Sequence, residues 1–187
     1  MRVCVFCSGS DAALDRYGEA AREVGRQIAA RGYSLVYGGT AVGLMGDLAA
    51  AARDGGAHVT GVISAMLVER GIADEGCDEL VVTEGMGQRK VEMFSRSDAF
   101  LALPGGLGTL DELLEAITLK QLGVHAKPIS LYGPSGFWDP FTELVARLHA
   151  RRMCLPPDQL TLTTDDLTAA LDHLEAGRVE PQAIWRA

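Results

Sequence analysis

The chain has 187 residues, of which 48% are hydrophobic and 22% charged, which suits one well-buried domain and is short for two complete ones. Its formal net charge of −8 disfavours a surface for nucleic-acid polymers, which bind through clustered Lys and Arg. No apolar run approaches the ~20 residues of a membrane span, and the opening apolar stretch is too short for a secretory signal. We therefore predict a single domain over residues 1–187 in the cytoplasm, with no membrane and no nucleic-acid partner.

The four cysteines are too few for a disulfide framework and suit a reducing compartment as thiols. Cys4 and Cys7 form a CxxC, but a second pair is absent and the motif begins in an apolar run that predicts a strand. This position favours a core thiol and a loop thiol over zinc or redox chemistry. The four histidines are scattered without ligand spacing, so we expect no metal and no cofactor.

Strands and helices are predicted to alternate along the whole chain. Short apolar and β-branched runs predict strands at 3–6, 35–37, 59–63, 80–83, 99–103, 128–131 and 160–163. Helical patterns fall between or after them, at about 17–28, 43–53, 86–96, 109–122, 138–150 and 165–174. This order indicates an α/β fold in which helices cover both faces of a parallel sheet. Such sheets bind ligands at their carboxyl edge.

A glycine turn in "LALPGGLGTLDELLEAIT" joins a predicted strand to a helix. Gly105, Gly106 and Gly108 permit positive φ and remove the Cβ atoms that would keep an anion from the backbone amides. With Thr109 at the helix N-terminus, free N–H groups and the helix dipole favour a phosphate. The alternative is a plain turn followed by a capping box, with Thr109 as N-cap and Glu112 as its partner.

Two familiar nucleotide motifs are excluded. The third glycine of G-x-G-x-x-G, counted from Gly106, would fall at Asp111, and no GxxxxGK[ST] occurs. The ligand is therefore expected to be smaller than a dinucleotide or a P-loop triphosphate. Arg89 and Lys90, on the preceding helix, border its apolar face and are candidate cations for this ligand, although such a pair is usually a solvated face.

A second glycine turn, "VYGGTAVGLMG", also joins a strand to a helix. Gly39 and its neighbours either hold ligand backbone at the same sheet edge or let the helix pack closely over the strand. We favour close approach combined with packing. Ser8 and Ser10, after the first strand, are weaker candidates for polar contacts and fit an ordinary turn equally well.

Four segments together resemble one family: "FCSGS", "LVYGGTAVGLMG", "MGQRKVEMFSRSDAFLALPGGLGTLDELLEAIT" and "QLGVHAKPI". Over residues 3–153 the chain resembles the LONELY GUY family of cytokinin riboside 5′-monophosphate phosphoribohydrolases, often mislabelled lysine decarboxylases. The resemblance implies a Rossmann-like fold, a homodimer, and hydrolysis of the N-glycosidic bond of a nucleoside 5′-monophosphate such as AMP.

The resemblance also implies residue roles. Arg89 and Glu112 are implied to be catalytic. Together with the two glycine turns, the candidate binding residues are Gly39, Lys90, Gly105, Gly106, Leu107, Gly108, Thr109, Leu110, Asp111 and Thr118. The chain departs from the family pattern at Gly71, Gly87, Leu107 and Leu119, where Glu, His, Tyr and Trp are common. These departures bear on recognition of the base and leave both catalytic positions intact.

The mechanism expected for this reaction passes through an oxocarbenium-like ribose. Glu112 would stabilise that cation or orient and deprotonate the attacking water, and Arg89 would hold the substrate. The main alternative is a carrier that binds a nucleotide or a phosphorylated pterin such as molybdenum cofactor without turning it over. A lysine decarboxylase would need a Schiff-base lysine and a pyridoxal phosphate site, and neither can be identified.

Overall fold

A computed structural model describes residues 1–177 of the chain. Its internal contacts divide the chain into two compact units, Met1–Asp98 and a second unit that begins at Ala99. The single domain expected from the chain length stays a prediction, and its positions 178–187 lie outside the described residues.

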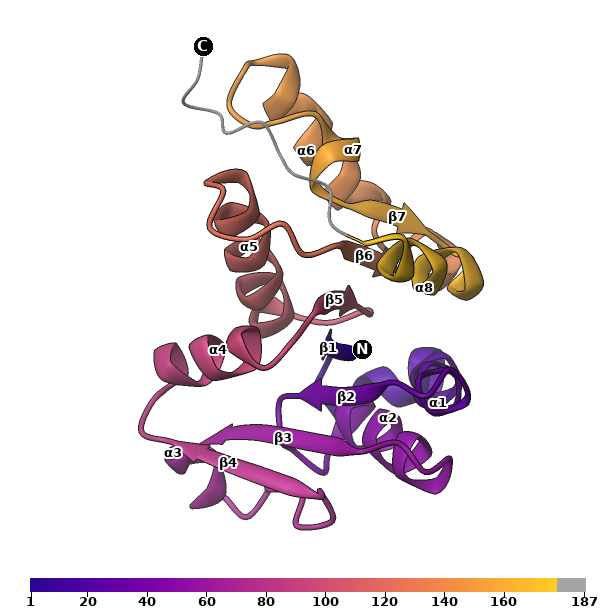
Figure 1. Cartoon of the computed structure of the whole chain (residues 1–187), viewed down its shortest axis with the longest axis vertical. Helices are drawn as coiled ribbons and strands as arrows, with labels where there is room; N and C mark the ends of the chain where they lie inside the picture. Colours follow the sequence, from indigo (N-terminus) through magenta and orange to yellow (C-terminus); the bar gives the residue numbers. More distant parts are fainter. Residues whose placement is uncertain (178–187) are drawn as a thin grey trace. The chain divides into compact units, whose positions relative to one another are not determined.

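The first unit has four strands in the order β4-β3-β2-β1, and every neighbouring pair is parallel (Figure 1). Its strands are β1 (Arg2–Phe6), β2 (Ser34–Tyr37), β3 (Val59–Ser64) and β4 (Glu79–Thr83). Its helices are η1 (Asp11–Ala13), α1 (Leu14–Ala30), α2 (Gly43–Asp54), α3 (Ala65–Val68) and α4 (Met86–Ser95).

Close packing of the first unit follows from its small and β-branched residues. All of β3 is buried, and α1 and α2 pack against each other and against β2. A Cβ at Gly25 would lie 2.5 Å from the Leu48 carbonyl oxygen, so only glycine lets the backbones of α1 and α2 approach so closely. Helix α4 packs against β3 and β4 and places Arg89 beside them.

Up to residue 177, the second unit has three parallel strands in the order β5-β6-β7. These are β5 (Ala99–Ala102), β6 (Ile129–Tyr132) and β7 (Leu162–Thr164). Its helices are α5 (Leu107–Gln121), η2 (Pro134–Gly136), α6 (Asp139–Ala150), α7 (Pro157–Leu160) and α8 (Leu167–Ala176). Helix α8 packs over β6 and β7, and α5 packs against β5.

The structure confirms the predicted alternation and the Rossmann-like α/β class, with differences at element ends. Helix α5 begins at Leu107 rather than Thr109, and the last strand begins at Leu162 because Pro157 starts a short helix before it. Helix α3 was not expected, since four residues are too few to show a helical period.

The cysteine prediction is confirmed for the pair in the CxxC. Cys4 and Cys7 are buried, and none of the four cysteines, all of which lie in the described part of the chain, forms a disulfide. Within residues 1–177, no helix combines the length and the apolar character that crossing a membrane requires.

Candidate functional site

The N-terminus of α5 follows directly from the carboxyl end of β5. Gly106 is the N-cap with extended backbone (φ −94°, ψ −155°), and Leu110 N–H donates to its carbonyl at 3.0 Å. In this geometry the amides of Leu107, Gly108 and Thr109 precede the first internal hydrogen bond and point out of the helix end. A Cβ added at Gly106 or Gly108 would meet no heavy atom within 4 Å, so the approach to these amides is open. The helix end is therefore a candidate anion site.

The structure decides two points about this turn that the sequence left open. Thr109 is not the N-cap, because Gly106 takes that position and the helix is already in its first turn at Thr109. Neither Gly105 nor Gly108 adopts positive φ. What Gly105 provides is space, since a Cβ there would lie 2.0 Å from the Thr109 hydroxyl oxygen. The capping-box alternative therefore fails, while close approach of the backbone remains.

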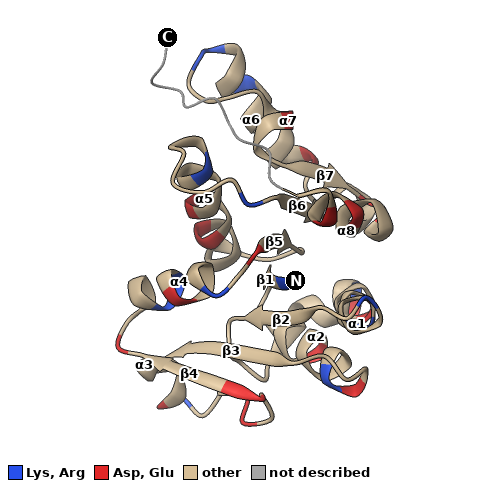
Figure 2. Ribbon diagram, in the orientation of Figure 1, with Lys and Arg blue, Asp and Glu red and all other residues tan. Residues whose placement is uncertain are grey.

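Glu112 lies on the buried face of α5, one turn after the open end. Its exposed fraction is 5%, and it shares that face with Thr109, Leu113 and Ala116. The first turn of α5 carries no acidic residue, Asp111 and Glu112 follow it, and Lys120 lies in the last turn; Figure 2 shows the acidic and basic residues apart along this helix. Lys120 complements the helix dipole, and a phosphate beside Glu112 would need a cation to offset the repulsion.

The remaining candidates on α5 lie outside this buried face. Leu107 is 85% exposed at the helix start, Leu110 is half-buried, and Asp111 is exposed. Thr118 is exposed about 14 Å along the axis from Thr109, at 1.5 Å per residue. Its role in the nucleotide site stays a prediction from the resemblance.

Arg89, on α4 of the first unit, is buried, with an exposed fraction of 3%. Its Nε donates to the Val62 carbonyl at 2.8 Å and its Nη2 to the Gly38 carbonyl at 3.0 Å. The interpretation of this pair as a solvated helix face is therefore wrong for Arg89. Lys90, the next residue, is half-buried. The backbone carbonyls of Gly38, directly after β2, and of Val62, within β3, fix the direction of the guanidinium.

In the second glycine turn, each glycine packs closely against neighbouring atoms. A Cβ at Gly43 (φ +63°) would lie 2.5 Å from Gly9 C, and one at Gly46 would lie 2.3 Å from the Ala41 carbonyl oxygen. Gly39 (φ +72°) rests against Val62 and Ile63. The packing role favoured from sequence is confirmed. The Ser8 hydroxyl accepts from Ser10 N–H, and so forms an ordinary turn.

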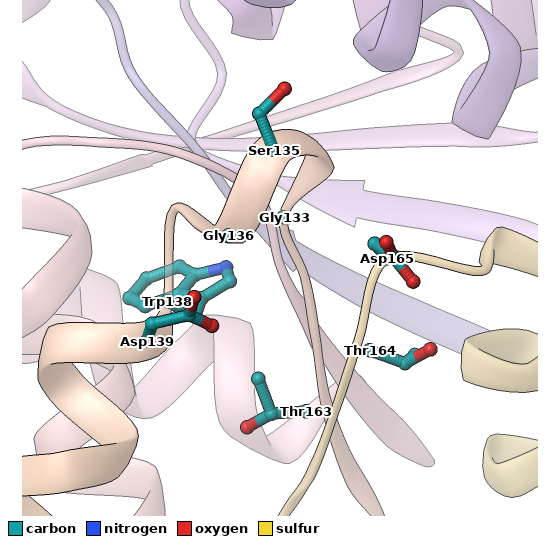
Figure 3. Close-up of a pocket in the computed structure, with 8 residues that line it drawn as sticks. All are labelled: Gly133, Ser135, Gly136, Trp138, Asp139, Thr163, Thr164 and Asp165. Carbon is teal, nitrogen blue, oxygen red and sulfur yellow. The ribbon is translucent and has the colours of Figure 1, made fainter.

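The second unit also contains a cavity of about 540 Å³ at the carboxyl ends of β6 and β7 (Figure 3). Its lining comprises Gly133, Ser135, Gly136, Trp138, Asp139, Thr163, Thr164 and Asp165. Asp139 and Asp165 are the charged residues of this lining, so the cavity has the wrong sign for a phosphate. We therefore place the candidate anion site at α5 and not in this cavity.

The structure brings the candidates together in two groups. Gly105 through Glu112 form one group in the second unit, and Gly39 and Arg89 form the other in the first. Sequence reasoning missed the carbonyls of Gly38 and Val62 because a backbone acceptor leaves no residue signature. It also missed Asp74, a buried carboxylate in a loop that shows no motif.

Parallel strands with glycine turns at their carboxyl ends define a Rossmann-like α/β protein with a candidate anion site. A family model described as "Possible lysine decarboxylase" matches residues 45–174. The cytokinin riboside 5′-monophosphate phosphoribohydrolase LOG of Oryza sativa subsp. japonica is 47% identical over 144 residues, which cover 77% of this chain and 60% of that protein. The probable phosphoribohydrolase LOGL9 of the same plant is 49% identical over 176 residues, covering 93% and 77%. The chain belongs to the LONELY GUY (LOG) family.

A solved structure supports the fold alone. The Moco carrier protein of Chlamydomonas reinhardtii matches with a TM-score of 0.70 at 24% identity, over 94% of this chain and 97% of that one. The chain spans about 60% of the length of rice LOG.

Proposed function

We propose that the chain hydrolyses nucleoside 5′-monophosphates to a free base and ribose 5-phosphate. The observation that carries the proposal is the burial of Glu112 one turn after an open helix N-terminus. Burying a carboxylate costs free energy, so its place beside a candidate phosphate site favours a chemical role. The names of LOG and LOGL9, both at least 47% identical, support the same reaction.

The 5′-phosphate is proposed to bind at the N-terminus of α5. The amides of Leu107, Gly108 and Thr109 are the outward-pointing donors there, and the open space at Gly106 and Gly108 admits phosphate oxygens. Binding energy from this end of the substrate would hold the sugar in position for the reaction.

Glu112 is proposed to act on the ribose. As the bond between C1′ and the base nitrogen breaks, the base keeps the electron pair and positive charge develops on the ribose. The carboxylate stabilises this charge and accepts a proton from the water whose oxygen bonds to C1′. The base leaves with that electron pair and takes up one proton at the same nitrogen, which balances the proton that Glu112 accepts from the water and completes the hydrolysis.

Arg89 is proposed to bind the substrate and to offset its negative charge. Two carbonyl acceptors hold one edge of the guanidinium, and a guanidinium has five donors in a planar fork. Because the fork is rigid, anchoring one edge fixes the direction of the whole group. Lys90, half-buried on the same helix, is proposed to add a second cation.

The preferred base is a separate part of the proposal. We expect both AMP and prenylated AMP to be substrates, with the departures at Gly71, Gly87, Leu107 and Leu119 setting their ratio. Purified protein is incubated with AMP or with isopentenyladenosine monophosphate, and free base and ribose 5-phosphate are separated chromatographically. Faster release from the prenylated nucleotide supports cytokinin activation, and equal rates support general nucleotide salvage.

The same experiment tests the carrier alternative. Tight nucleotide binding without release of base from either substrate would overturn the hydrolase proposal in favour of a carrier.

Assembly into a homodimer is also proposed from the family, and side chains such as Met66, Val82 and Met86 leave apolar surface exposed on the first unit. Light scattering after size-exclusion chromatography measures the molar mass in solution, which distinguishes a dimer from a monomer.

A further inference from the structure

Asp74 is a buried carboxylate at the centre of a polar cluster in the first unit. Its Oδ2 accepts from the Tyr37 hydroxyl at 2.7 Å and from Arg53 Nη1 at 2.6 Å, and its Oδ1 accepts from Gly76 N–H at 3.0 Å. Burial raises the pKa of the Asp74 carboxyl, but these three donors outweigh it, and the pKa is lowered. The group is thus a charged anchor, which we call the Asp74 network: Tyr37, Arg53 and Asp74.

The loop that carries Asp74 is tied to the second glycine turn. Asp74 N–H donates to the Gly39 carbonyl and Ala41 N–H donates to the Ile72 carbonyl, both at 2.9 Å. Thr40 and Ala73 form an antiparallel bridge between these two bonds. The anchored loop therefore acts as a short strand laid along residues 39–41.

The turn held by this loop is the one that orients Arg89. The Gly38 carbonyl, which precedes residues 39–41, accepts from Arg89 Nη2, and a Cβ at Gly38 would lie 2.1 Å from that nitrogen. Gly61 of β3 packs closely against both segments, because a Cβ there would lie 2.9 Å from Gly39 Cα and 2.8 Å from Cys77 Sγ. A shift of the loop that carries Asp74 is therefore passed to the Gly38 carbonyl that holds the guanidinium.

We infer that the Asp74 network positions Arg89 for turnover by locking the loop at 72–77 against the glycine turn at 38–41. This inference rests on the proposed role of Arg89 in the hydrolysis. A buried charged cluster adds little to stability compared with apolar packing of similar volume, and a positional role explains its presence here. The network acts through Arg89 and is therefore a positioning group rather than a catalytic one.

The test compares variants of the full-length chain. In Asp74→Asn an amide replaces the carboxylate, so the negative charge and one of the two acceptor oxygens are lost. Tyr37→Phe removes one donor and keeps the ring. We expect kcat to fall about tenfold in Asp74→Asn and less in Tyr37→Phe, with KM within about twofold of wild type. Arg53→Lys, which keeps the charge, should retain more activity than Arg53→Met.

Asp98→Asn is the matched control. Asp98 accepts from Arg2 N–H at 2.8 Å and from Arg2 Nη2 at 2.9 Å, and so forms another carboxylate–arginine pair of the same unit, but its partner lies at the start of β1. We expect it to lower stability without changing kcat. An equal fall of kcat in Asp98→Asn, or an unchanged kcat in both network variants, would overturn the inference.

A second measurement separates this inference from the proposed function. The Arg89 Nε–H, which donates to Val62, gives a side-chain NMR signal whose hydrogen exchange reports its anchoring. Exchange should be faster in Asp74→Asn and Tyr37→Phe and unchanged in Asp98→Asn. If the wild-type chain hydrolyses no nucleotide, the proposed function fails, and this exchange still decides whether the network positions Arg89. Unchanged exchange in both network variants would refute positioning.

Discussion

The two glycine turns look alike in sequence and differ in structure. In the turn of the first unit, added Cβ atoms at Gly38, Gly43 and Gly46 would lie 2.1–2.5 Å from neighbouring atoms. In the turn of the second unit, Gly106 and Gly108 have no heavy atom within 4 Å of such a Cβ. The first turn is therefore part of the packed scaffold, and the second presents open backbone to a ligand.

The difference shows that a glycine-rich turn after a strand has two separate uses. Glycine at Gly43 lets one backbone approach another inside the protein, whereas glycine at Gly108 leaves room for a molecule outside it. Gly105 combines both, because its missing Cβ accommodates the Thr109 side chain next to the open end. The following substitutions separate these uses, beginning with the largest expected effect.

Glu112→Gln should remove most of the activity at the open turn. The amide cannot accept a proton or stabilise a developing cation as a carboxylate does, so we expect kcat to fall about 100- to 1,000-fold. Nucleotide binding, measured by calorimetry, should stay within about threefold of wild type. Glu115→Gln, three residues further along α5, is the control and should keep its activity. Near-normal turnover in Glu112→Gln would remove this residue from the chemistry.

Gly43→Ala should test the packed turn through stability. A Cβ at Gly43 would lie 2.5 Å from Gly9 C at φ +63°, so the backbones must separate, and we expect a loss of about 3 kcal/mol in the free energy of unfolding. Gly56→Ala is the control, because Gly56 has φ +87° and no neighbour within 4 Å. It should lose only about 1 kcal/mol, from backbone strain alone. Equal losses in urea denaturation would argue against the packing explanation.

Lys120, in the last turn of α5, is a buried lysine whose charge should make stability depend on pH. Its Nζ donates to the Leu160 carbonyl at 3.0 Å, and burial lowers the pKa of Lys120 from 10.5 to about 8. The unfolded chain then binds more protons than the folded one from about pH 8 to 10.5, so stability should rise with pH in that range. The expected gain is about 3 kcal/mol.

Lys120→Met should flatten this rise while filling nearly the same space. Urea denaturation of both proteins at pH values on either side of this range measures the difference. A wild-type chain whose stability does not change across the range would show that Lys120 keeps an ordinary pKa.

Gly108→Ala should produce the smallest change in stability, with the opposite sign from Gly43→Ala. Alanine favours a helix over glycine by about 1 kcal/mol, and nothing at this position obstructs a methyl group. The variant should therefore unfold at a slightly higher urea concentration, but KM for AMP should rise because the methyl group enters the proposed phosphate site. An unchanged KM would place the phosphate elsewhere.

The sequence predicted the order of strands and helices because period-2 and period-3.6 patterns depend on local residues. It placed Arg89 and Lys90 on the helix that precedes β5 and the glycine turn at a strand end, and these positions are confirmed. It began the next helix at Thr109, two residues late, because glycine also occupies N-caps and Thr109 packs against Gly105 inside the first turn. The joint role of Arg89 and Glu112 stays a prediction.

The sequence by itself determined the α/β class, the two glycine turns and the family, since each depends on residue types at fixed spacing. Only the tertiary structure decided which turn is packed and which is open, because that depends on backbone from distant positions such as Gly9 and Val62. It also placed Asp74 beneath the first turn, through contacts with Tyr37 and Arg53 that span 37 and 21 positions. Contacts over such separations leave no local pattern, so they become visible only when the chain is folded.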